Sequence, residues 1–233
     1  MGIHDKHRER LRERFLKFGL DTFDDHNAIE LLLLFAIPRK DMNEVAHHLL
    51  NRFGTLAAVF DAPFSELIAV PGIGPISACF LKLIPQICRR YLISRSGFDV
   101  ILNTSQKAGD YLVSHFYAER DEVVYMVCLD AKCKVLNCQL LFRGGVNSTS
   151  VSIRKIVENA LVYNSTSAII AHNHTSGIAI PSKEAEATTR KIYEALNAVG
   201  IELADHIVVA DEDFVSMYDS GFFKNARKSS YGF

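Results

Sequence analysis

Apolar residues follow two different patterns along this chain, and the change falls near residue 98. Before it, apolar residues recur every three or four positions, as Leu11, Phe15 and Phe18 do, which is typical of amphipathic helices. After it, apolar runs with the spacing of strands alternate with helical segments. The pattern predicts a small all-α domain over residues 1–98 and a mixed α/β domain over residues 99–225.

The order of elements in the second segment predicts one mixed sheet with helices packed on it. Helices are expected at residues 105–116 and 152–162, and a third begins after Ser182 and stops at Gly200. Strands are expected at residues 122–129 and 135–143, in the run that starts at Ser167, and at residues 205–210. The last residues, 228–233, are expected to be frayed.

Composition narrows the class of protein. The chain is 48% hydrophobic and 23% charged, which is ordinary for a globular protein. It contains no apolar run of the ~18–20 residues that a membrane span needs, and its N-terminus is charged, unlike that of a signal peptide. Five cysteines without a Cys-x-x-Cys pair indicate reduced thiols. These features predict a cytoplasmic protein with no membrane partner.

Charge excludes a strongly basic nucleic-acid module in either half. Residues 1–98 hold 13 Lys and Arg against 11 Asp and Glu, and the remainder holds 13 against 16. The first helix is the exception, with basic residues crowded into three turns: Lys6, Arg8, Arg10, Arg12, Arg14 and Lys17. An amphipathic helix with a solvated charged face explains them without any ligand, and contact with phosphates is the alternative.

A glycine-rich turn joins two short helices near the end of the first domain. Gly72, Ile73 and Gly74 stand in this turn, and the region of about residues 65–92 resembles the helix-hairpin-helix DNA-binding motif. Glycines permit a tight turn, and amides at the start of the next helix can hold a phosphate without reading bases. Pro75 removes one amide, and Ser77 stands where a lysine often assists. The motif therefore predicts at most weak, nonspecific DNA binding.

Two histidines mark the candidate chemical site. His172 and His174 follow an apolar run, and residues two apart on a strand point the same way. Neutral imidazole is a common zinc ligand, and catalytic zinc usually takes three protein ligands and one water. Ser182 is the expected N-cap of the next helix, so residue 185 lies in its first turn, facing the histidines. That residue is Ala185.

These residues resemble the JAMM metallohydrolase motif, which is His-x-His, seven residues, and then Ser-x-x-Asp, with a glutamate far upstream. Other segments of the chain resemble the bacterial RadC family, also called UPF0758, over nearly its whole length. The segments that carry this resemblance are Phe142-Arg143-Gly144-Gly145, Asn147-Ser148-x-Ser150-Val151, Ala171-His172-Asn173-His174-x-Ser176-Gly177, Pro181-Ser182 and Asp205-His206-Ile207-Val208-Val209.

The resemblance implies a JAB/MPN domain and a role for each site residue. His172 and His174 would be zinc ligands, Glu122 would be the general base, and Ser182 would stabilise the oxyanion. The third ligand of the family, an aspartate, falls on Ala185, and Thr175 stands where the family has proline.

Two flanking acidic residues could take the place of that aspartate. Glu184 and Glu186 stand on either side of Ala185. On a helix, the side chain of each points about 100° away from the direction of residue 185. Glutamate, however, is one methylene longer than aspartate.

The resemblance implies a zinc-dependent hydrolase of peptide or isopeptide bonds, acting near DNA and impaired by Ala185. The alternative is a noncatalytic, DNA-associated binding protein that uses the MPN fold as an interaction surface. Simpler roles stay open for three residues: Glu122 as a solvated strand-edge carboxylate, Ser182 as a helix cap only, and His206 as a partly buried brace of the sheet. Asp205 and His206 also have the residue types of a catalytic dyad, but the bracing role of His206 is the preferred interpretation.

Overall fold

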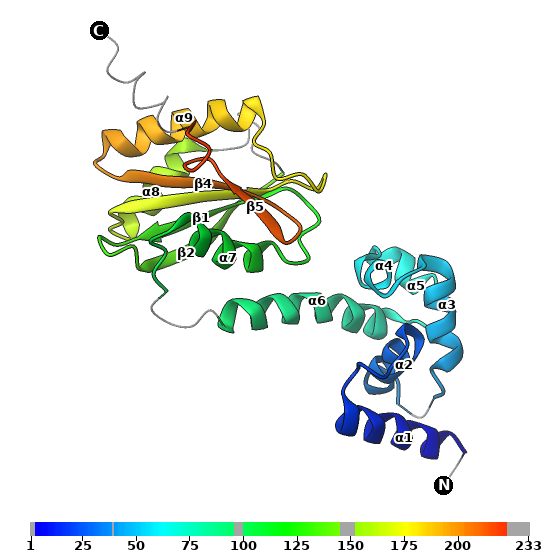
Figure 1. Ribbon diagram of the computed structural model, residues 1–233. Helices are drawn as coiled ribbons and strands as arrows, with labels where there is room; N and C mark the ends of the chain where they lie inside the picture. Colours follow the sequence, from blue (N-terminus) through cyan, green and yellow to red (C-terminus); the bar gives the residue numbers. More distant parts are fainter. Residues whose placement is uncertain (1–2, 39, 96–99, 145–151, 223–233) are drawn as a thin grey trace. The chain divides into compact units, whose positions relative to one another are not determined.

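The computed structural model describes residues 3–38, 40–95, 100–144 and 152–222 (Figure 1). The chain forms two compact units, residues 1–88 and 89–233. Three segments used in the sequence analysis lie outside the described part. They are the predicted domain boundary at residues 98 and 99, residues 145–151, which carry part of the family resemblance, and the C-terminal residues 223–233. None of the helices in the described ranges has both the length and the apolar character that crossing a membrane requires.

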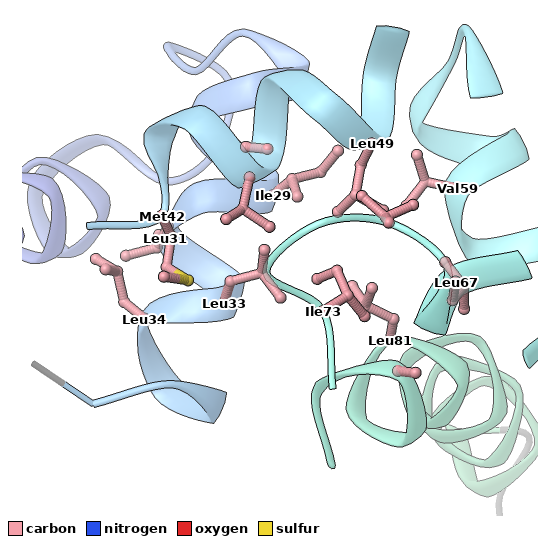
Figure 2. Packing of buried hydrophobic residues seen from close by; sticks show 14 of the residues in the cluster. Ile29, Leu31, Leu33, Leu34, Met42, Leu49, Val59, Leu67, Ile73 and Leu81 are labelled. Atoms are coloured by element: carbon pink, nitrogen blue, oxygen red, sulfur yellow. The ribbon is translucent and has the colours of Figure 1, made fainter. Parts of the chain in front are cut away.

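The first unit is helical, as predicted. Its helices are α1 (Ile3–Phe18), α2 (Asp25–Ala36), α3 (Asn43–Phe53), α4 (Leu56–Asp61), α5 (Phe64–Ile68) and the beginning of α6 (Pro75–Arg95). Their apolar faces meet in one core, in which Ile29, Leu49 and Leu81 are fully buried (Figure 2). Burial of such side chains stabilises the unit by about 1.5–3 kcal/mol each.

The turn between α5 and α6 depends on one glycine. Gly72 has a φ of +90°, a conformation that other residues rarely adopt. A Cβ at this position would lie 2.6 Å from Cγ2 of Val45, whereas a Cβ at Gly74 would meet no atom within 4 Å. Gly72 is therefore required by the fold itself, and only Gly74 is open to substitution.

The second unit is a mixed five-stranded sheet flanked by helices, which confirms the predicted fold class. Its elements are α7 (Ser105–Phe116), β1 (Val123–Leu129), β2 (Val135–Arg143), α8 (Ile153–Val162), β3 (Ser167–Asn173), α9 (Lys183–Ala198), β4 (Glu202–Ala210) and β5 (Asp213–Ser216). The strand order is β2-β1-β3-β4-β5, in which only β3 and β4 are parallel. Every residue of the central strands β1 and β3 is buried, because each has strands on both sides and helices on both faces.

Alternation along the strands separates two cores. One face carries Val124, Met126 and Ile170 beneath α8 and α9, and the other carries Val127 and Ile169 beneath α7 (Figure 1). Strand β4 begins three residues earlier than predicted, and the short strand β5 was not predicted at all. The face beneath α9 is the one that carries the histidines.

Candidate metal centre

The histidine pair lies at the end of β3, in the middle of the sheet. His172 is opposite Val124 of β1 and Val208 of β4, and it is 1% exposed. His174 follows the strand directly. The two rings turn to the same side, as predicted, and their Nε2 atoms are 3.1 Å apart. The backbone of His172 is held by a strand on each side, and the His174 amide donates to the Val209 carbonyl of β4 at 2.8 Å.

The intervening Asn173 ties β3 to the start of β1. Its side-chain oxygen accepts a hydrogen bond from the Val123 amide at 2.7 Å, and its amide nitrogen donates to the Asp121 carbonyl at 3.1 Å. These two bonds bracket Glu122, whose own carbonyl accepts from the Gly144 amide at 2.7 Å. The backbone of the candidate base is therefore fixed on both sides.

Glu122 stands one residue before β1 and is half-buried. In the antiparallel register Val124 pairs with His172, so continuing the register two residues outward matches Glu122 with His174. Alternation then places the carboxylate on the face that carries the histidines. Even so, no three histidine, cysteine or acidic side chains converge as a metal site anywhere in the described ranges.

The position of the third ligand is filled by the methyl group of Ala185, which is 1% exposed. Ser182 caps α9, as predicted: its Oγ accepts from the Ala185 amide at 3.1 Å. Glu184 and Glu186 are both exposed, and neither forms a three-ligand group with the histidines. The start of α9 therefore carries a hydroxyl at its N-cap and an alanine, not a carboxylate, at position 185.

His206 plays a larger part than its sequence context indicated. It is fully buried, not partly buried, and its Nε2 lies 2.7 Å from His172 Nδ1. Its Nδ1 lies 2.5 Å from Thr189 Oγ1 of α9. Asp205 accepts from the backbone amide of His206, not from its ring, so the two residues form no catalytic dyad. The contact between His206 and His172 could not be read from the sequence, because it depends on the parallel pairing of β3 with β4.

Burial keeps the inner histidines neutral. It lowers the pKa of His172 well below the ordinary value, with further lowering from His206 and His174, and it lowers the pKa of His206 to about 3. A metal ion binds the neutral form of imidazole. His172 therefore has the protonation state that metal binding would require near pH 7.

The pair fits two positions of a tetrahedral metal ion. Zn–N bonds of 2.0–2.1 Å at tetrahedral angles place two nitrogens about 3.3 Å apart, close to the observed 3.1 Å. The second nitrogen of each ring is also engaged, since His174 Nδ1 donates to the Ile178 carbonyl at 2.9 Å and His172 Nδ1 contacts His206. Such partners orient metal-binding histidines. The geometry thus suits a two-nitrogen metal site.

The predicted hairpin residues lie in the first unit and serve its core. Ile73 is 6% exposed and packs among apolar residues. The Gly74 amide donates to Ser77 Oγ at 3.0 Å, and the same hydroxyl donates back to the Gly74 carbonyl at 3.0 Å. One of the amides expected to face a phosphate is thus occupied by Ser77.

Comparisons with known proteins cover both units. Residues 102–222 match the model of the RadC-like JAB domain, and residues 4–79 match that of the UPF0758 N-terminal family. A UPF0758 protein of Azotobacter vinelandii is 35% identical over 95% of this chain and 100% of its own length. UPF0758 proteins of Pseudoalteromonas translucida and Pseudomonas savastanoi are 34% and 32% identical, each over 91% of this chain and 95% of theirs. The chain belongs to the UPF0758 family and carries a RadC-like JAB domain.

Proposed function

We propose that this protein is a zinc-dependent hydrolase of peptide or isopeptide bonds whose activity is weak because zinc has only two protein ligands. The observation that carries the proposal is the 3.1 Å separation of the Nε2 atoms of His172 and His174. It matches the spacing of two ligands on one tetrahedral ion. Both rings also have the second hydrogen-bond partner that metal-binding histidines use.

Each residue would have one task in amide hydrolysis. Bound zinc supplies Lewis acidity, which polarises an amide carbonyl and acidifies water. His172 and His174 hold the ion, and the Glu122 carboxylate takes the proton from the attacking water and passes it to the leaving amine. Ser182 Oγ uses a lone pair to accept from the Ala185 amide, so its hydrogen can be donated to the developing oxyanion.

Zinc binding to the protein with its native histidine pair tests this proposal directly. We expect titration with zinc, followed by competition with a chromophoric chelator, to show one weak site per chain. The change of both His172 and His174 to glutamine should remove that site, since the amide side chain is a poor zinc ligand. Cys79, which is exposed, and Cys133, which is partly buried, are both changed to serine in every sample to remove competing thiols. Zinc binding that persists in the double glutamine variant would refute the proposal.

A second candidate function is noncatalytic binding of DNA by the first unit. The observation in its favour is the tight turn at Gly72, which connects α5 to the start of α6 with a φ of +90°. Two features weaken such binding: Pro75 at the first position of α6 has no amide hydrogen, and Ser77 occupies the Gly74 amide. We expect weak binding that does not depend on base sequence.

Gly74 allows this second function to be tested without disturbing the core, because its Cβ direction is open. Gly74→Glu places a negative charge beside the turn and should abolish binding to duplex DNA in a fluorescence anisotropy titration. Gly74→Gln, of nearly the same size, should retain most of it. Wild-type affinity should fall with salt by ~0.9 log units per phosphate contact for each tenfold rise in salt. Equal binding by both variants would exclude the turn as a phosphate site.

A further inference from the structure

Four side chains of the second unit form a line of polar contacts that begins and ends on backbone carbonyls. The contacts are Ile178 O to His174 Nδ1 (2.9 Å), His174 Nε2 to His172 Nε2 (3.1 Å), His172 Nδ1 to His206 Nε2 (2.7 Å), His206 Nδ1 to Thr189 Oγ1 (2.5 Å), and Thr189 Oγ1 to Ala185 O (2.6 Å). His172, His206 and Thr189 are at most 1% exposed, so water does not take the place of these partners.

The line contains one hydrogen fewer than it needs. A neutral imidazole carries one N–H and a threonine one O–H, so three neutral rings and Thr189 supply four hydrogens for the five contacts just given. The carbonyls at both ends can only accept. With all three rings neutral, one contact must therefore join two lone pairs.

The position of that contact follows from the fixed ends. Thr189 donates to the Ala185 carbonyl, so its oxygen accepts from His206 Nδ1, and His206 Nε2 then accepts from His172 Nδ1. At the other end His174 Nδ1 donates to the Ile178 carbonyl. This leaves both facing Nε2 atoms bare, and their contact is the longest of the five at 3.1 Å. A lone-pair contact at 2.5 or 2.6 Å, at the Thr189 end of the line, would be far more repulsive.

We propose that Thr189 and His206 are positioning residues that fix the hydrogen of His172 on Nδ1 and so present its bare Nε2 to a metal ion. The inference rests on the proposed function and adds to it the residues that prepare a ligand. A cation between the two Nε2 atoms would satisfy every contact at once. Both lone pairs would bind the cation and no longer repel each other, and the four hydrogens would serve the four remaining hydrogen bonds. The Met217 sulfur, 3.7 Å from Thr189 Oγ1, is a weaker acceptor and does not change this count.

Thr189 offers a matched pair of variants. Thr189→Val keeps the shape of the side chain and removes the acceptor for His206, so zinc affinity should fall by ~10- to 100-fold, the range for partners of metal-binding histidines. Thr189→Ser keeps the hydroxyl and should stay within about threefold of the wild type. Thermal unfolding confirms that both variants are folded. If the wild type binds too weakly to measure, the same pair is compared in the Ala185→Asp background. Equal zinc affinity of the valine and serine variants would overturn the proposal.

A second measurement does not depend on zinc. Nitrogen-15 NMR of histidine-labelled, metal-free protein distinguishes the two tautomers of each ring. We expect His172 to carry its hydrogen on Nδ1 in the wild type and in Thr189→Ser, and to lose this preference in Thr189→Val. A wild-type His172 with its hydrogen on Nε2 refutes the positioning role even if zinc binds. Failure of the wild type to bind zinc, with the Nδ1 tautomer present, refutes the proposed function and leaves the positioning role intact.

Discussion

Ala185→Asp is expected to raise zinc affinity by on the order of 100-fold or more, because it adds an anionic third ligand beside the two imidazoles. Position 185 is 1% exposed and lies in the first turn of α9, where the helix dipole favours negative charge. Without metal the new carboxylate is a buried, unpaired charge, so the variant should be less stable than the wild type. Added zinc should restore its melting temperature, because the ion binds only the folded state.

Controls separate the charge from the shape of the new side chain. Ala185→Asn has nearly the same size as Ala185→Asp but no charge, and its zinc affinity should stay close to that of the wild type. Hydrolysis of a peptide or isopeptide substrate should appear in Ala185→Asp and disappear again when Glu122→Gln is added, with zinc content retained. A folded Ala185→Asp protein with wild-type zinc affinity would show that residue 185 does not face the metal. Activity that survives Glu122→Gln would place the base elsewhere.

Asp205→Ala is expected to lower the free energy of unfolding by about 3–5 kcal/mol, measured by urea denaturation. The carboxylate accepts from the amides of His206 and Tyr218 at 2.7 and 3.0 Å and from Ser216 Oγ at 2.6 Å. Alanine leaves these three donors without their acceptor, at a cost of about 1–3 kcal/mol for each that stays buried. The loss would loosen β4, the strand that carries His206, against β5.

Asp205→Asn is the matched control and should cost far less than alanine. Its amide oxygen can accept from both backbone amides, and its NH₂ can donate to Ser216. Burial raises the pKa of Asp205, so the folded state favours the protonated form more than the unfolded state does. Stability from this group is therefore complete below the unfolded pKa of about 3.9 and decreases as pH rises through the folded pKa. The asparagine variant should lack this decrease. If alanine and asparagine destabilise equally, the hydrogen bonds of Asp205 are not what the fold requires.

The fold was largely predictable because its strongest signals are local. Residues 168–171 before His172 are all apolar, which is typical of a buried central strand, and β3 is buried along its whole length. The Ser182 cap also fixed the start of α9. Strand β5 escaped prediction because it has only four residues after a turn at Asp211, and its place at the sheet edge depends on pairing with β4.

The site was predictable only where spacing along one element decides it. The shared direction of His172 and His174 follows from strand alternation, and the alanine at the third position could be read directly. The contacts of His206 with His172 and Thr189 join three elements and could not be inferred from any local pattern. The hydrogen bond between Ser77 and Gly74 could not be inferred either. It occupies the Gly74 amide, which the sequence alone had suggested was available to a phosphate.

The anchoring of β3 between β1 and β4 also bears on which metals can be accepted. An ion that prefers linear coordination by two ligands, such as Cu(I), requires nitrogens about 4 Å apart, twice a bond of ~2 Å. The Nε2 atoms of His172 and His174 stand 3.1 Å apart, and Asn173 between them is bound to the backbone around Glu122. The backbone beside the pair is thus anchored, and rotating either ring apart would break the contact of its Nδ1 with His206 or with the Ile178 carbonyl. If the pair binds an ion as proposed, its spacing favours ions that accept a narrow bite angle and complete their coordination with solvent.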